Sequence, residues 1–221
     1  AMDYTFDDPA CNLALDEVLL REAESGGFGE SLRFWESSTP FIVLGLTQSV
    51  QTEVDVDASD AFCVPIHRRC SAGGCVVQGS GCLNYSLVLS KKNFPEVTTI
   101  HGSYAYILGA VIAALGIPEL QKAGISDIAL GECKVSGNAQ RRHKNYILHH
   151  GTLLYAADLT RFSTLLKEPK DRPEYRGSRA HESFVTNLDV NRERLVHSVS
   201  KAFQVSKAEN KVDAGLIEKT R

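Results

Sequence analysis

Three strand-like segments follow one another near the middle of the chain, and the links between them are too short to hold a helix. They are SDIAL (126–130), CKVSGNAQRR (133–142) and NYILHHGTLLY (145–155). Parallel strands need a crossover of a dozen or more residues, whereas a tight turn can join antiparallel strands. The polar residues 142–145 supply such a turn between the last two segments. This part of the chain therefore predicts an antiparallel sheet.

The remaining pattern alternates short strands with a few amphipathic helices. Further strands are expected at 32–36 and 41–45, joined by a turn over 37–40, and at 64–69, 75–78 and 83–89. Helices are expected at 9–24, irregularly at 49–61, and at 100–115, 159–167 and 192–203. Asp8 and Pro9 form a helix start, and glycines from Gly26 onward end that helix. We expect an α+β fold with mainly antiparallel sheets flanked by helices.

Length and composition limit the classes of protein to which the chain can belong. At 221 residues we expect one folded domain over residues 2–206 and a polar tail over 207–221. No apolar run is long enough to span a membrane, and because the start is acidic and lacks the basic and apolar regions of a signal peptide, we expect none there. The net charge of −3 argues against nonspecific nucleic-acid binding. Basic clusters such as 141–144 are either a solvated face or a docking surface for an acidic partner.

The six cysteines favour a reducing compartment, and we expect a cytoplasmic protein. No CxxC pair occurs, and the spacing of Cys70, Cys75 and Cys82 matches no common zinc pattern. We therefore expect no metal site built from protein ligands, and we interpret most of the cysteines as small buried hydrophobic residues.

A glycine-rich stretch at residues 68–89 reads RRCSAGGCVVQGSGCLNYSLVL. Without β-carbons, Gly73 and Gly74 let the backbone approach a ligand and point N–H groups at it. Arg68 or Arg69 can add a bidentate contact to a phosphate or carboxylate. The stretch is neither a P-loop nor a good dinucleotide fingerprint. A plain hairpin is the structural alternative.

Two later residues add weight to the ligand interpretation. Lys134 lies in a segment that is otherwise small and apolar, and Ser136 and Gly137 follow it. His149 and His150 interrupt an apolar strand, and neighbouring strand residues face opposite sides, so at most one of them faces a given site. The structural alternatives are an edge lysine and a pair of histidines of which one is packed and one exposed.

With these residues the chain resembles the lipoate–protein ligase A family, within the wider group of biotin and lipoate ligases and transferases. Four blocks carry the resemblance: FIVLGLTQS, RRCSAGGCVVQGSGCLNYSL, SDIALGECKVSGNAQRRHKNYILHHGTLLYAADL and SFVTNL. Together with the first helix they span residues 9–188. The combination of RRxSxGG, KxSGxAQ and HHGTLL is specific, although each alone is not.

The resemblance implies a biotin/lipoate ligase catalytic-domain fold over residues 2–206 and a lipoate–protein ligase activity. Family members bind lipoate or octanoate in an apolar tunnel and activate it with ATP and Mg²⁺ to an acyl-adenylate. They then transfer the acyl group to a lysine of a lipoyl carrier domain, such as those of 2-oxoacid dehydrogenase E2 subunits or the glycine cleavage H protein. Lys134 matches the central catalytic lysine. The residues expected to bind substrate or nucleotide are Arg69, Ser71, Gly73, Gly74, Cys75, Val76, Val77, Ser136, Gly137, Ala139, His150 and Gly151.

The chain also departs from the family pattern. Ala72 replaces a glycine, Gln78 replaces a frequent histidine, and Cys133 beside the lysine is unusual. The chain ends where many ligases continue into an accessory domain that adenylation usually needs. We therefore expect one of three arrangements: a separate accessory subunit, acyl transfer alone, or a small domain that suffices.

Two alternative functions remain open at this point. One is a lipoyl or octanoyl amidotransferase that uses a preformed acyl donor. Cysteine-dependent transferases hold the acyl group on a cysteine after the HG strand, and no cysteine follows Cys133 here. The other is a non-catalytic scaffold that binds lipoate.

Overall fold

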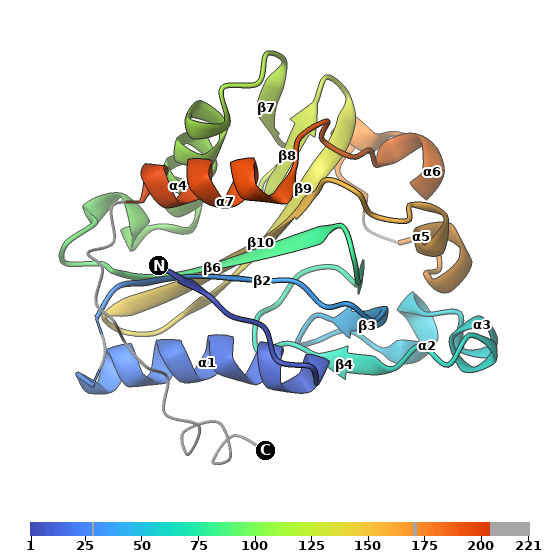
Figure 1. Ribbon diagram of the computed structural model, residues 1–221, viewed down its shortest axis with the longest axis horizontal. Coiled ribbons are helices and arrows are strands. Elements are labelled where there is room, and N and C mark those ends of the chain that lie inside the picture. Colours follow the sequence, from blue (N-terminus) through green and yellow to red (C-terminus); the bar gives the residue numbers. More distant parts are fainter. Residues whose placement is uncertain (28, 170–171, 204–221) are drawn as a thin grey trace.

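The computed structural model describes residues 1–27, 29–169 and 172–203, and its larger sheet has seven strands (Figure 1). Their order is β1 (Met2–Asp3), β2 (Ser31–Trp35), β6 (Cys82–Ser90), β10 (Tyr146–Leu154), β9 (Cys133–Arg142), β8 (Asp127–Leu130) and β7 (Leu120–Ala123). Only β1 and β2 pair in parallel; the other neighbours are antiparallel. The three segments expected at 126–155 are β8, β9 and β10, so the predicted antiparallel sheet is confirmed.

A smaller sheet of three strands lies beside the larger one. Its order is β4 (Ile66–Arg68), β3 (Phe41–Leu44) and β5 (Val76–Gln78). β2 and β3 are the strands expected on either side of the turn 37–40, but they do not pair with each other. The chain crosses at this turn from the large sheet to the small one.

Helix α1 (Pro9–Ser25) covers one face of the large sheet. Asp8 accepts a hydrogen bond from the Ala10 amide, and Gly26 ends the helix at φ 87°, a left-handed conformation that suits glycine. The apolar side of α1 packs on Val88 of β6 and Leu148 of β10. Burial of this stripe seats the helix against the two central strands.

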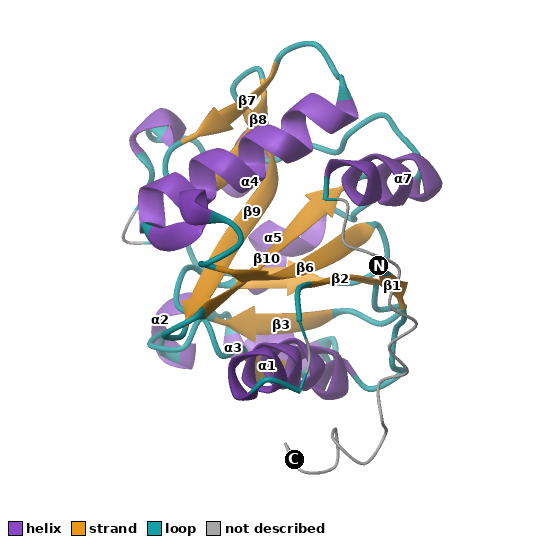
Figure 2. Ribbon diagram, turned by 90° about the vertical axis from the view of Figure 1, so that its left-hand side faces the viewer, coloured by secondary structure: helices purple, strands orange, loops and turns teal. Residues whose placement is uncertain are grey.

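Two helices cover the opposite face of the sheet, as both ribbon views show (Figures 1 and 2). Helix α4 (Ile100–Leu115) ends at Gly116, and helix α7 (Arg192–Ala202) packs beside it. Their apolar side chains form the main core with β2, β6, β8, β9 and β10. The large sheet therefore lies between α1 on one side and α4 with α7 on the other.

Short elements complete the part of the chain that the structure describes. The expected irregular helix is two short ones, α2 (Val50–Glu53) and α3 (Val56–Ala61), and α5 (Thr160–Leu165) falls inside the expected 159–167. Sequence patterns did not indicate β1, β7, α6 (His181–Phe184), η1 (Pro95–Thr98) or η2 (Glu174–Arg176). The expected tail over 207–221 lies outside the described residues.

None of the helices within residues 1–27, 29–169 and 172–203 combines the length and the apolar character needed to cross a membrane.

Candidate functional site

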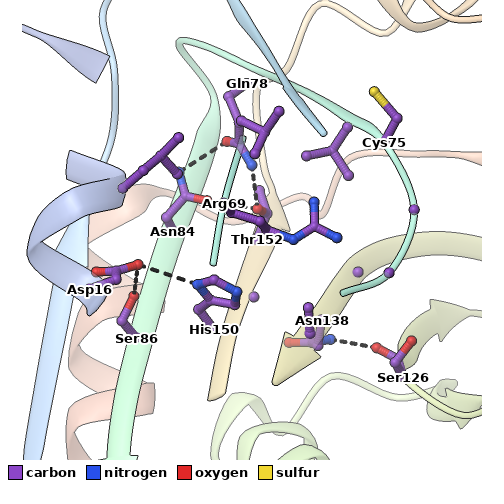
Figure 3. A pocket seen from close by; sticks show the side chains of 18 of the residues that line it. Asp16, Arg69, Cys75, Gln78, Asn84, Ser86, Ser126, Asn138, His150 and Thr152 are labelled. Atoms are coloured by element: carbon purple, nitrogen blue, oxygen red, sulfur yellow. Dashed lines mark hydrogen bonds and ion pairs between the residues drawn. The ribbon is translucent and has the colours of Figure 1, made fainter. Parts of the chain in front are cut away.

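Two cavities meet at the glycine-rich turn after β4. The inner cavity, of about 160 Å³, lies among α1, β5, β6, β9 and β10 (Figure 3). The outer one, of about 910 Å³, extends from the same turn toward α5, α6 and the segment 173–176. Both are lined by the turn residues 73–76, by Asp127 and by Lys134. The site thus has a small inner part and a large outer part that share one wall.

The shared wall depends on two glycines that no other residue could replace without strain. Gly73 has a φ of 105°, and a β-carbon there would lie 2.9 Å from Nη2 of Arg69. Gly45, at the end of β3, lies so close beneath the turn that its β-carbon would be 2.0 Å from the Gly73 carbonyl oxygen. The backbone of the turn is therefore held in contact with the end of the small sheet.

Arg69 is a buried cation at the edge of the inner cavity. Its exposed fraction is 8%, and burial lowers its pKa from the ordinary value. Its Nε donates to Ser71 Oγ and its Nη2 to the Ala72 carbonyl oxygen. Among the described residues it joins no ion pair. A buried guanidinium without a carboxylate partner is suited to an anionic ligand.

The neighbouring Arg68 has a structural role instead. It is exposed, and its Nη1 donates to the backbone carbonyl oxygens of Gly45, Leu46 and Gln48. Of the two arginines considered from the sequence, only Arg69 lines a cavity.

Lys134 lies on β9, where it lines both cavities. Its Nζ is 2.9 Å from Oδ1 of Asp127, and Tyr175 donates to the other oxygen of that carboxylate at 2.8 Å. A β-carbon on Gly137 would lie 2.9 Å from Lys134 Nζ, so the absence of a side chain at Gly137 gives the ammonium its room. This cation is half-buried and paired, and its partner lies beside the cavity rather than within the core.

The two histidines of β10 face opposite sides, as the period of a strand requires. His149 is fully buried beside Tyr85 and Tyr104 on the α4 side, and burial, with the charge of His150, lowers its pKa to about 3. His150 lines the inner cavity on the α1 side, with Nδ1 3.4 Å from Asp16 Oδ2 (Figure 3).

A polar trio forms another part of the inner cavity wall. Gln78 donates to Thr152, Thr152 donates to Asn84, and Asn84 donates back to Gln78, at 2.7, 2.7 and 3.0 Å (Figure 3). The apolar side chains of Leu13, Trp35, Val43 and Val76 complete this cavity. A closed trio leaves few free donors, so it bounds the cavity without imposing a strong charge.

The cysteines near the site are poorly suited to act as nucleophiles. Burial raises the pKa of Cys70, Cys75 and Cys82 to about 12, which keeps each thiol protonated at neutral pH. Cys75 lines both cavities, and the nearby charge of Glu53 also raises its pKa. Within the described part of the chain no three histidine, cysteine or carboxylate side chains cluster as metal ligands would.

The structure brings most of the expected site residues together. The cavity walls contain Arg69, Gly73, Gly74, Cys75, Val76, Val77, Lys134, Gly137, Ala139, His150 and Gly151. Two expected residues line neither cavity. Ser71 is fully buried behind Arg69, and Ser136 is fully buried on β9, where it pairs with Leu153 and accepts from Asn138.

Several lining residues were missed from the sequence. They are Leu13, Asp16, Trp35, Val43, Gln78, Asn84, Ser86, Ser126, Asp127, Asn138 and Thr152 for the inner cavity. Asp16 carried a usable signal, because it is a charged residue on the apolar side of a predicted helix. No sequence signal marked Trp35 or Asn84 as site residues, since only the pairing of β2 with β6 brings them together.

Comparison with known proteins agrees with this geometry. A family model described as the lipoyl protein ligase A/B catalytic domain matches residues 8–205. Lipoate–protein ligase 1 of Staphylococcus aureus is 30% identical over 186 residues, which are 82% of this chain and 53% of that protein. Octanoyltransferase LipM of Oceanobacillus iheyensis is 27% identical over 223 residues, with 92% of this chain and 81% of that protein covered. The chain thus spans about half the length of the first of these relatives.

Among solved structures, a similar fold occurs in the archaeal lipoylation system of Thermoplasma acidophilum. That structure is described as a bi-partite lipoate protein ligase with its E2 lipoyl domain. It superposes with a TM-score of 0.81 at 23% identity, covering 99% of this chain and 88% of the other. At this identity the likeness concerns the fold.

Proposed function

The chain belongs to the lipoyl protein ligase A/B catalytic domain family, and on that premise we propose that it is a lipoate–protein ligase. In this proposal it activates lipoate with ATP to lipoyl-adenylate and transfers the lipoyl group to a lysine of a lipoyl carrier domain. The 30% identity to a lipoate–protein ligase over most of this chain supports the ligase over other activities in the family.

The observation that carries the proposal is the position of Lys134 where the two cavities meet. An acyl chain in the inner cavity and a nucleotide in the outer one would bring carboxylate and α-phosphate together beside this ammonium. Four methylenes of a lipoyl chain contribute only about 3 kcal/mol at about 0.8 kcal/mol each. The cations Lys134 and Arg69 are therefore needed to fix the anionic end.

The first reaction is attack of a lipoate carboxylate oxygen on the α-phosphorus of ATP, with pyrophosphate as the leaving group. Negative charge develops at the phosphorus in a partly dehydrated site, where a fixed cation stabilises it strongly. Lys134 and Arg69 are placed to supply that charge. Backbone N–H groups of the glycine turn at 73–76 add donors without side chains in the way.

In the second reaction the carrier lysine amine attacks the acyl carbonyl carbon, and AMP leaves with the electrons of the broken bond. The mixed anhydride is already activated, so no protein nucleophile is needed. This agrees with the protonated state of Cys75 at neutral pH.

Mg²⁺ as a companion of ATP fits the residues present. Magnesium is usually held by one or two carboxylates together with substrate phosphates and water. Asp127, Glu53 and Glu174 line the outer cavity, and Asp127 adjoins Lys134. Glu53, Glu174 or Asp127 would hold such an ion, which would neutralise phosphate charge, and Asp127 would have to share its oxygens with Lys134 and Tyr175.

The same proposal includes the partners. We expect the carriers to be lipoyl domains of 2-oxoacid dehydrogenase E2 subunits or the glycine cleavage H protein, and a separate accessory polypeptide to assist adenylation. The Thermoplasma structure is described as a bi-partite ligase with its E2 lipoyl domain, which supports this arrangement. The six described cysteines are all free, as is typical of a reducing compartment, so we place the reaction in the cytoplasm.

A second candidate is an octanoyl or lipoyl transferase that takes its acyl group from a preformed donor. The 27% identity to an octanoyltransferase over 92% of this chain favours it. A route through an enzyme thioester would need a reactive cysteine, and the one cysteine that lines the cavities, Cys75, has a raised pKa. Direct transfer from acyl-adenylate has no such requirement.

The mass of a carrier domain separates these activities. A gain of one lipoyl group with the protein, ATP, Mg²⁺ and lipoate supports the ligase. A gain only with synthetic lipoyl-adenylate supports direct transfer or a need for the accessory polypeptide. A gain only from an octanoylated carrier supports the transferase, and no gain in any case supports the non-catalytic scaffold.

A further inference from the structure

A continuous chain of hydrogen bonds runs from the interior of the sheet to the buried arginine of the site. Ser71 Oγ lies 3.0 Å from Arg69 Nε and 2.6 Å from His150 Nε2. His150 Nδ1 lies 3.4 Å from Oδ2 of Asp16. Asp16, Ser71 and Arg69 are at most 8% exposed, and the His150 side chain is 12% exposed, so these contacts are largely shielded from bulk water.

With a neutral imidazole, the donors and acceptors of this chain have one consistent arrangement. The Asp16 carboxylate can only accept, so His150 Nδ1 must carry a proton and donate it. Nε2 is then the acceptor, and Ser71 supplies its hydroxyl proton. The lone pairs of Ser71 are left to accept from Arg69 Nε. Each contact then pairs one donor with one acceptor, and Arg69 Nε is reached through a defined series of partners.

Asp16 is well placed to anchor such a chain. It receives Nη1 of Arg33 at 2.8 Å and the hydroxyl of Ser86 at 2.7 Å. Arg33 is also held by the carbonyl oxygen of Asn12 and by that of Tyr4. The anchor therefore ties α1 to β2, β6 and β10, which are rigid elements of the core.

We propose that Asp16, His150 and Ser71 are positioning residues that hold Arg69 against the anionic part of the bound acyl-adenylate. Arg69 lines the inner cavity, its Nε and Nη2 are hydrogen-bonded, and its Nη1 has no hydrogen-bond partner among the described residues. It is a buried cation directed by its neighbours and open to a ligand. The inference rests on the proposed function for the identity of that ligand, but the hydrogen-bond chain itself can be tested without it.

The first experiment compares two buried serines. Ser71→Ala removes the link between His150 and Arg69. Ser103→Ala is the matched control, because Ser103 is also fully buried and accepts from an arginine, Arg142, but lies in α4 away from both cavities. The probe is a non-hydrolysable lipoyl-adenylate analogue, and its dissociation constant is measured by titration calorimetry.

We expect Ser71→Ala to weaken binding of the probe about tenfold, the effect of losing one charge-assisted contact. We expect Ser103→Ala to change it less than threefold at a similar loss of thermal stability. Equal effects of the two variants, or unchanged binding by Ser71→Ala, would overturn the proposal. An acyl ester on Ser71, detected by mass spectrometry after turnover, would also overturn it by making Ser71 a nucleophile.

The second experiment asks which end of the imidazole matters. In His150→Gln the longer amide reaches the place of Nε2 and keeps the contact with Ser71, whereas in His150→Asn the shorter amide keeps only the contact with Asp16. We expect Gln to retain more of the probe affinity than Asn. The reverse order contradicts the relay.

Nitrogen-15 NMR of the ligand-free protein gives a readout that does not depend on activity. We expect His150 to carry its proton on Nδ1. A proton on Nε2 alone would overturn the relay, even if the protein were an active ligase. If the wild-type protein did not bind the probe at all, the proposed function would fail, and the tautomer of His150 would still decide whether the relay exists.

Discussion

Single residues account for the charge of the site. Lys134 is paired with Asp127, and Arg69 has neutral partners only among the described residues. An incoming carboxylate or phosphate therefore competes with Asp127 for Lys134, whereas no carboxylate competes with it for Arg69 among the described residues. The energetic contribution of each cation can be measured separately, because Lys134 lies on β9 and Arg69 lies in the turn after β4.

Replacement of Lys134 by alanine is expected to lower the rate of lipoylation by at least tenfold and to leave the fold intact. Loss of a charge-assisted contact costs about 1.5–3 kcal/mol, and more where charge develops in a dry site. The rate of transfer to a carrier domain, followed by mass spectrometry, is the measurement. Lys122→Ala is the control, since this exposed lysine on β7 lines neither cavity and its ammonium donates to the Gly124 carbonyl oxygen. Near wild-type transfer by Lys134→Ala would refute the assignment.

Alkylation of the cysteines should follow their burial. We expect iodoacetamide at pH 8 to modify the exposed Cys63 well before Cys75. Burial and the charge of Glu53 raise the pKa of Cys75 to about 12, so its reactive thiolate is scarce at that pH and increases as the pH rises toward 12. Peptide mass mapping over time gives the order. Accordingly Cys75→Ser should keep most of the lipoylation activity, and an acyl thioester trapped on Cys75 would contradict this.

Whole elements determine how the site residues are held. Helix α1 contributes to one buried face both an apolar stripe and Asp16, which pairs there with Arg33 of β2. The glycine turn rests on the end of β3. Each arrangement links the stability of an element to the geometry of a cavity wall.

Removing one partner of the buried pair that joins Asp16 of α1 to Arg33 of β2 is expected to destabilise the protein strongly. Arg33→Met leaves Asp16 without its main counter-charge, which typically costs about 3–5 kcal/mol. Urea unfolding measures this loss. Exposed Arg161→Met is the control, because its pair with Asp158 is solvated and contributes little.

The pair also predicts a pH dependence. Burial alone raises the pKa of Asp16, but the hydrogen bond from His150 and the charge of Arg33 outweigh it and hold the pKa below the ordinary 3.8. A lowered carboxyl pKa contributes stability that is complete above 3.8 and is lost as the pH falls through the folded value. The difference in unfolding free energy between wild type and Asp16→Asn should therefore be constant from pH 5 to 7 and shrink below about pH 4. A difference that grows in acid would contradict this sign.

Of two glycine-to-alanine substitutions, one should impair ligand binding and the other should stabilise the protein. Gly45→Ala would place a methyl group 2.0 Å from the Gly73 carbonyl oxygen, so the turn must move and ligand binding should weaken at least tenfold. Gly109→Ala, in the middle of α4, meets no atom within 4 Å and should stabilise the protein by about 1 kcal/mol. Calorimetric binding and thermal unfolding of both variants provide the comparison.

Long elements could be predicted from the sequence, because local signals specify them. Helix α1 was expected at 9–24 and spans Pro9–Ser25, since the start at Asp8 and Pro9 and the stop at Gly26 lie in the chain itself. Strands β1 and β7 could not be predicted, because pairing with distant β2 and β8 makes these short segments strands.

The site residues likewise divide into those that local motifs predict and those that only the fold brings together. Its glycine turn, Lys134 and His150 lie in recognisable motifs. The sequence left open which of His149 and His150 faces the cavity, since that depends on the register of β10 against β9 and β6. Asp16 and Trp35 reach the same cavity only through the packing of α1 and β2 on the sheet, which no local pattern encodes.

At the scale of the whole molecule, the site lies between the two sheets and draws residues from both ends of the described chain. α1 and β2 supply Asp16 and Trp35, while α6 and the segment before it supply Phe184 and Arg176 to the outer cavity. A ligand that fills both cavities therefore connects distant segments, and its binding should be visible in the unfolding of the entire domain.

A lipoyl-adenylate analogue at a hundred times its dissociation constant should raise the unfolding temperature by about 5–10 °C. Such a ligand adds about 2.7 kcal/mol to stability, and a domain of this size shifts by about 2–4 °C per kcal/mol. Differential scanning calorimetry measures the shift, with AMP alone as the control. A shift no larger than that with AMP would mean that the inner cavity does not take the acyl chain.

The opposed placement of His149 and His150 has a consequence for how this gene can vary. A codon gained or lost in β10 before the two histidines would exchange the faces of their side chains: His149 would turn from the α4 core into the cavity, and His150 from the cavity into the core. Every residue beyond that point on the strand would change sides as well. Heritable changes in length should therefore accumulate in connections away from the cavities, such as 143–145, whereas β10 itself should diverge only by substitution.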